Sequence, residues 1–149
     1  MRNNRREIDR RYKKNRYRKD DIYRLKVLLI KVVGRAIKHN VAYKENGRLN
    51  KILQINHKGL IDHLNNNSYG FQCGMEGIDM DHIKPLLLAK TKKQIYEFFI
   101  YTNIQLLPSE YNRYVKGTKK WDQEHFEGWL MANQKTYKQI LNSKKIKND

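Results

Sequence analysis

Apolar residues are scarce at the start of the chain and then recur with the spacing of a helix. Within residues 20 to 40, the apolar positions from Ile22 to Ala36 fall on one face, and lysine and arginine take the other faces. Asp20 or Asp21 precedes the first apolar position and is suited to cap a helix. The pattern predicts one amphipathic helix over this region.

Two shorter helices are expected next, near residues 49 to 55 and 57 to 64. The pair Asn46-Gly47 marks a turn before the first of them. Asn56 precedes the second and is suited to be its N-cap.

After residue 70 the helical spacing of apolar residues gives way to short apolar segments separated by glycine and proline. The segment from residue 75 to residue 83 is short, contains a glycine and is followed by Pro85. This pattern predicts a strand that runs into a turn. Residues 102 to 107 predict a second strand, and Thr91 is expected to cap a helix between the two. We also expect irregular backbone over residues 81 to 84.

A helix is predicted over residues 109 to 116, ending at Gly117. Asp122 is expected to cap a single last helix, whose apolar positions run from Phe126 to Leu141. Residues 142 to 149 read as a lysine-rich tail.

The first 19 residues differ from the rest in charge. They hold ten Lys or Arg against two acids, with Tyr12 and Tyr17 between them. So few apolar residues predict a flexible arm, which serves either as a solubilising tail or, as we favour, as a segment that follows a phosphate backbone. The candidate nucleic-acid contacts in the arm are Arg5, Arg6, Arg10, Arg11, Lys13, Lys14, Arg16 and Arg18.

The net charge of the whole chain indicates what kind of partner it binds. Its 149 residues fit one small domain, and 32 Lys or Arg against 15 Asp or Glu give a formal net charge of +17. A nucleic-acid phosphate backbone is therefore the expected partner, and no apolar run is long enough to span a bilayer. The single cysteine, Cys73, allows no internal disulfide, so we expect an intracellular and not a secreted protein.

The residues suited to metal binding and catalysis lie in the second half of the chain. Asp81 offers a carboxylate oxygen and Asn112 an amide oxygen, a pair that favours Mg²⁺ or Mn²⁺ over a structural zinc. His82 is the candidate general base, and Asn103 is expected to accept a hydrogen bond from its ring and fix its orientation. Neighbours on a regular strand face opposite sides, so Asp81 and His82 should sit where the strand ends or twists.

Three blocks carry a resemblance to a known family: Asp-His-Ile-x-Pro-Leu from residue 81, Tyr-Thr-Asn-x-Gln-x-Leu from residue 101, and Asn-x-x-x-Lys-Gly from residue 112. Their order and spacing resemble the HNH (ββα-metal) endonucleases, most of all the small bacteriophage and intron-type homing enzymes. The likeness covers about residues 22 to 121.

The resemblance implies double-stranded DNA as the partner and hydrolysis of its phosphodiester bonds with one divalent cation, Mg²⁺ or Mn²⁺. It implies that Asp81 and Asn112 hold the cation and that His82 and Asn103 are catalytic. The chain departs from the usual pattern in its last position, which is Asn and not His, and in Leu87 and Leu88, where small polar residues are usual.

The expected fold class is α+β, a mostly helical small domain with an embedded ββα-metal motif and basic flexible termini. Its parts are a basic arm (1–19), a helical DNA-contacting subregion (20–68), the motif core (69–121), and a C-terminal helix with a basic tail (122–149). Further candidate contacts to nucleic acid are Lys84, Arg113 and Lys116.

Two other functions stay open. One is a non-cleaving nucleic-acid-binding or structural protein on an HNH scaffold, in a ribonucleoprotein particle for example. The other is an electrostatic partner of acidic protein or membrane, which the motif disfavours. Cutting both strands with one site per chain would call for two copies, so a homodimer also stays open, and a phage-encoded enzyme would act in the host cytoplasm.

Overall fold

The computed structural model describes residues 2–39 and 47–143, with the side chains from residue 4 onward. The chain is mostly helical with one two-stranded antiparallel sheet, which confirms the α+β class. In chain order the elements are α1 (Arg2–Lys19), α2 (Asp21–His39), α3 (Gly47–Leu53), α4 (His57–Asn65), β1 (Ile78–His82), η1 (Leu86–Leu88), α5 (Lys92–Phe98), η2 (Tyr101–Asn103), β2 (Ile104–Pro108), η3 (Tyr111–Lys116), α6 (Gln123–Ala132) and α7 (Gln134–Ser143).

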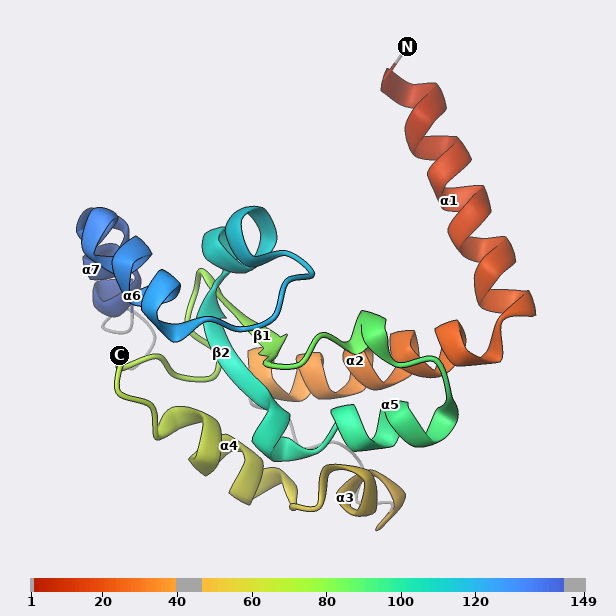
Figure 1. Cartoon of the computed structure of the whole chain (residues 1–149), viewed down its shortest axis with the longest axis horizontal. Helices are drawn as coiled ribbons and strands as arrows, with labels where there is room; N and C mark the ends of the chain where they lie inside the picture. The colour runs from red at the N-terminus through yellow and green to blue at the C-terminus, as the bar shows by residue number, and fades with distance from the viewer. Residues whose placement is uncertain (1, 40–46, 144–149) are drawn as a thin grey trace.

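The sheet lies in the middle of the molecule, with α2, α4 and α5 around it (Figure 1). Its register places Ile78 opposite Pro108 and His82 opposite Ile104. Helix α2 contacts β1, and α4 contacts β2. Both predicted strands are therefore present, each shorter than expected at one or both ends.

Four predicted caps are confirmed, and each explains where a helix begins. The side chains of Asp20, Asn56, Thr91 and Asp122 accept the backbone N–H three residues further on, at distances between 2.8 and 3.2 Å. These bonds satisfy donors that the first helical turn leaves without a partner. Thr91 forms a full capping box, because the side chain of Gln94 also accepts from the Thr91 N–H.

An aromatic cluster joins the C-terminal helices to the sheet region. Phe126 of α6 is fully buried, and its ring packs against Phe71, Tyr111 and Trp121 at centroid distances of 6.4, 4.8 and 5.0 Å. Tyr111 begins η3, so this cluster fixes the helix that follows β2.

The basic arm is a helix, which differs from the flexible segment expected. Helix α1 projects away from the rest of the molecule (Figure 1), and its described side chains are almost all exposed. Two ion pairs with i,i+4 spacing support it, Glu7–Arg11 at 2.8 Å and Arg16–Asp20 at 3.3 Å. Arginine and lysine also favour the helix intrinsically, so the absence of a buried face does not imply an irregular chain.

The last predicted helix is in fact two. Asn133 leaves the helical region (φ −119°), and its side-chain amide donates to the Trp129 carbonyl, which closes α6 before α7 begins. The predicted tail from residue 144 onward and the turn at Asn46 lie outside the described residues.

The helix predicted over 109 to 116 is present but wider than an α-helix. Its η3 portion is a π-helix, in which the Gly117 N–H donates to the Asn112 carbonyl five residues earlier at 2.9 Å. Gly117 ends it with φ +53°, a conformation that favours glycine.

The expectation of irregular backbone over residues 81 to 84 is only partly right. Asp81 and His82 pair regularly with Gln105 and Ile104, and the chain bends only at residues 83 and 84. Among the described helices, none is long and apolar enough to cross a lipid bilayer.

Replacing Phe126 tests the aromatic cluster. Phe126→Ala should lower the free energy of unfolding by about 3 to 5 kcal/mol, because it opens a cavity among three packed rings. Urea unfolding measures this, and Met131→Ala on the exposed face of the same helix is the control, expected within about 0.5 kcal/mol of the parent.

Candidate functional site

The predicted metal ligand Asp81 holds a buried ion pair with Lys116. Lys116 Nζ lies 2.8 Å from Asp81 Oδ1, and the two side chains are only 2% and 8% exposed. The same ammonium donates to the His82 carbonyl at 3.3 Å. The sequence leaves Lys116 as either a phosphate contact or a residue that caps the helix end. In the structure its ammonium is instead buried inside the protein, in the pair with Asp81.

Gln105 completes the surroundings of the carboxylate. Its side-chain amide donates to Asp81 Oδ2 at 2.9 Å, so both carboxylate oxygens have a partner. Sequence reasoning gave Gln105 no role. The signal was available, because pairing the two predicted strands places Gln105 directly across from Asp81.

His82 follows Asp81 on β1, and its ring turns the other way. The imidazole packs on Phe99 with a centroid distance of 4.8 Å, and it is buried. In the described part of the chain, its Nε2 atom has no hydrogen-bond partner. Burial, aided by the nearby Lys116 charge, lowers the pKa of His82 from an ordinary 6.5 to about 4. The imidazole is therefore neutral at pH 7, the form that accepts a proton.

Asn103 is placed differently from the expectation. Its Oδ1 accepts the Lys84 N–H at 2.8 Å, and its Nδ2 donates to the carbonyls of Lys84 and Phe98 at 3.1 and 2.7 Å. The prediction that Asn103 accepts from the His82 ring is therefore wrong in this structure, because the amide is used on backbone. Asn103 fixes the bend that ends β1, and so acts on the position of His82 from a distance.

Asn112 lies on η3, four residues before Lys116. The polar side chains that reach the Asp81 carboxylate among the described residues are Lys116 and Gln105, and not Asn112. Asn112 contributes its backbone carbonyl to the π-turn. The structure thus pairs Asp81 with Lys116, with His82 adjacent, and no hydrogen bond among the described residues links Asp81 to Asn112.

Two other candidate contacts have partners within the chain. Arg113 forms a bidentate pair with Asp79, at 3.0 and 3.2 Å, which links η3 to β1. The Lys84 ammonium lies 4.2 Å from the centre of the Phe98 ring. Both side chains are nevertheless on the surface, where a phosphate could compete for them.

The arm offers a more open basic surface. Arg6, Arg10 and Lys13 are exposed and lie on one face of α1, because residues three, four and seven apart share a helix face. Arg11 and Arg16 are paired with acids, as described above. The remaining candidates of the arm, Arg5, Lys14 and Arg18, are also exposed.

A hollow of about 190 Å³ opens beside the ion pair. Asp81, His82 and Lys116 line it, together with Leu87 and the chain after η3, Gly117 and Thr118. Asp81 and His82 both border this hollow, so it is the candidate place for a ligand of the site.

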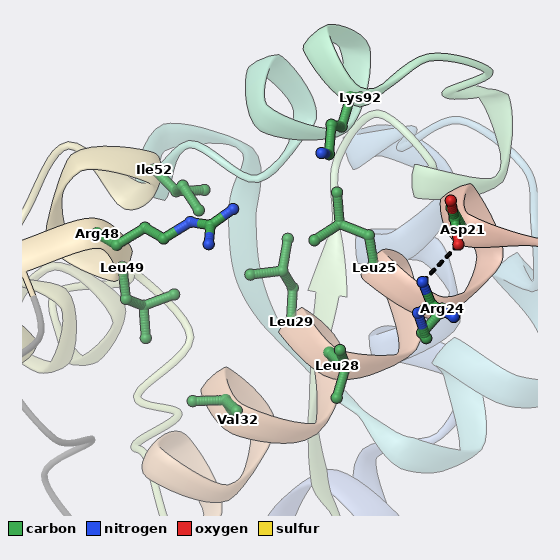
Figure 2. A pocket seen from close by; sticks show the side chains of 10 residues that line it. All are labelled: Asp21, Arg24, Leu25, Leu28, Leu29, Val32, Arg48, Leu49, Ile52 and Lys92. Carbon is green, nitrogen blue, oxygen red and sulfur yellow. Dashed lines mark hydrogen bonds and ion pairs between the residues drawn. The ribbon is translucent and has the colours of Figure 1, made fainter. Parts of the chain in front are cut away.

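A second hollow, of about 510 Å³, lies between α2, α3 and α5 (Figure 2). Its walls are aliphatic, with Leu28 and Ile52 among them, and Arg48 and Lys92 stand at its edge. It contains no imidazole or carboxylate beyond Asp21, which pairs with Arg24. A further hollow, of about 520 Å³, also holds ionisable groups, among them His39, Glu76 and Asp79. We take Asp81 and His82 as the candidate place for hydrolytic chemistry because they belong to the block of sequence that carries the HNH resemblance.

The hollow offers a hard divalent cation one carboxylate. Asp81 lines it, and so does His82, whose buried ring nitrogen has no described partner, whereas Gln105 and Asn112 are not among its lining residues. Within residues 2–39 and 47–143, no three His, Cys, Asp or Glu side chains cluster as metal ligands. Among the residues that line the hollow, Asp81 supplies the carboxylate that a cation would need.

No family model matches the chain, and no curated protein or solved structure matches it significantly. The assignment of the site therefore rests on the geometry of its own residues.

The buried imidazole predicts how stability depends on pH. Because the pKa of His82 is lower in the folded chain than in the unfolded one, the unfolded chain takes up the proton first. This contribution to stability is complete above pH 6.5 and is lost as the pH falls toward 4.

Between pH 7 and pH 5, the parent protein should therefore lose about 2 kcal/mol more of its free energy of unfolding than His82→Gln, which cannot be protonated. Urea unfolding at the two pH values measures the difference. Equal losses in the two proteins would show that the ring is not held neutral.

Proposed function

We propose that the protein is a metal-dependent DNA endonuclease of the HNH type. The observation that carries the proposal is the buried Asp81–His82 pair at the end of β1, in a β1–β2–η3 arrangement, beside a hollow that reaches both residues. Strand, strand and helix occur in the order that the HNH resemblance implies. The net charge of +17 supports a nucleic-acid substrate.

His82 is proposed as the general base. Its pKa of about 4 keeps the ring neutral at pH 7, so it is in the accepting form but is a weaker base than an exposed histidine. The ring takes a proton from water as the water oxygen bonds to phosphorus. The bond from phosphorus to the 3′ oxygen breaks, and this oxygen then gains a proton from solvent.

Asp81 and Asn112 are proposed to hold the divalent cation, Mg²⁺ or Mn²⁺, which when bound supplies Lewis-acid polarisation of the phosphate. Asn103 is proposed as a positioning residue, since its three bonds to backbone fix the bend after His82. Arginine and lysine of α1 and the exposed Lys84 and Arg113 are proposed to contact the DNA backbone.

A second candidate is a nucleic-acid-binding protein that does not cleave. One observation favours it: Lys116 and Gln105 hydrogen-bond to the two oxygens of Asp81, so both oxygens already have a partner within the chain. Such a protein would bind DNA with a strong dependence on salt and leave it intact.

Plasmid nicking distinguishes the two candidates. With Mg²⁺ or Mn²⁺, the parent protein should convert supercoiled plasmid to the relaxed form, and chelation of the metal should stop it. His82→Gln should slow the reaction by about 10²- to 10⁴-fold, the usual contribution of a positioned base.

His63→Gln is the matched control, because His63 is exposed and outside the motif. It should nick at the parental rate. Tight binding of the plasmid without any metal-dependent nicking would refute the nuclease and support the second candidate.

The exposed face of α1 gives a separate prediction about binding. Replacing Arg6, Arg10 and Lys13 with alanine should weaken DNA affinity for all sequences alike and reduce the slope of log K against log salt by about 3, since about one counterion is released per phosphate contact. Fluorescence anisotropy over a salt series measures the slope.

A charge-matched triple variant, Lys120→Ala with Lys135→Ala and Lys138→Ala, removes three exposed lysines near and on the C-terminal helices. It should leave the slope closer to that of the parent. Equal losses in both triple variants would mean that α1 contributes only through net charge.

A further inference from the structure

Lys116 places a positive charge where a metal cation would have to bind. Its ammonium is 2.8 Å from Asp81 Oδ1, and the other oxygen accepts from Gln105 at 2.9 Å. The side chain of Lys116 is 2% exposed, so this charge is part of the protein interior. A buried carboxylate therefore already has a counter-ion, supplied by a residue 35 positions away.

We propose that Lys116 is the internal occupant of the cation site, and that a divalent metal binds Asp81 only by displacing its ammonium. This rests on the proposed function, since it assigns the metal to Asp81. Two cations on one buried carboxylate repel strongly, because an interior screens charge poorly. Direct coordination also requires the oxygen that Lys116 now holds.

The surroundings give the displaced side chain somewhere to go. Lys116 is the last residue of η3, and Gly117 after it has a positive φ and no atom within 4 Å of the place of a Cβ. Lys116, Gly117 and Thr118 all line the hollow of about 190 Å³ that also reaches Asp81. The same hollow offers a path for the metal to enter and for the ammonium to leave.

Removing the lysine charge should therefore strengthen metal binding. In calorimetric titrations of the full chain with MnCl₂, Lys116→Met should bind Mn²⁺ about tenfold more tightly than the parent, a coupling of ordinary size between competing groups. Lys120→Met, which removes an exposed lysine four residues further on, should bind as the parent does. Equal or weaker binding by Lys116→Met than by the parent would overturn the proposal, as would no binding by either.

Folding of the variant needs a second measurement, because Lys116→Met leaves Asp81 buried without its counter-ion. Lys116→Gln keeps a hydrogen-bond donor toward Asp81 and removes only the charge, so it replaces the methionine variant if that fails to fold. In thermal unfolding, MnCl₂ should raise the midpoint of the charge-removed variant more than that of the parent. This excess should vanish when Asp81→Asn is added, and an excess that survives would overturn the proposal.

The outcome separates this proposal from the nuclease. Parental nicking that requires His82, together with unchanged Mn²⁺ affinity in Lys116→Met, would overturn only the competition. Tighter Mn²⁺ binding in Lys116→Met without nicking by any variant would support the competition and leave the non-cleaving candidate.

Discussion

The buried ion pair between Asp81 and Lys116 is the interaction on which the site depends. It ties η3 to β1 across 35 residues, and the same ammonium holds the His82 carbonyl. Loss of either partner would leave an uncompensated charge in the interior, which typically costs about 3 to 5 kcal/mol. Each of the two charged side chains therefore holds the other in place inside the protein, so a substitution of either one changes both the stability of the fold and the site.

Successive side chains of a regular strand point to opposite faces of the sheet, and this gives the neighbours Asp81 and His82 different surroundings. The Asp81 carboxylate turns to η3, and the His82 ring turns to Phe99 at the end of α5. The acid side is charged and fully hydrogen-bonded, whereas the imidazole side is apolar and keeps the ring neutral. Asn103 holds the bend directly after this pair and so sets where the alternation stops.

Local signals predicted most of the elements. The caps at Asn56, Thr91 and Asp122 followed from residue type and position, and both strands were found from their apolar runs and the following breaks. Such features depend on a few neighbouring residues, which the sequence shows directly. The motif that contains Asp81, His82, Asn103 and Asn112 could be recognised for the same reason, since it consists of residue types at fixed positions along the chain.

Long-range pairing was not readable in the same way. The sequence leaves Lys116 as a phosphate contact or a cap of the helix end, because its partner Asp81 is set by how η3 packs against β1. Asn103 was assigned to the His82 ring, whereas the nearest backbone groups compete for the same amide. The lack of apolar residues in the arm predicts a flexible segment. This criterion leaves out helix propensity and the i,i+4 ion pairs of α1, which favour the helix.

The π-turn of η3 bears on which residue pairs with Asp81. It holds one residue more between Asn112 and Gly117 than an α-helical turn does. Lys116, whose ammonium pairs with the buried carboxylate, is the last of these residues. The counter-ion of Asp81 thus comes from the segment where the backbone hydrogen bonding departs from the α-helical pattern, so the number of residues in this segment matters to the site as well as their identity.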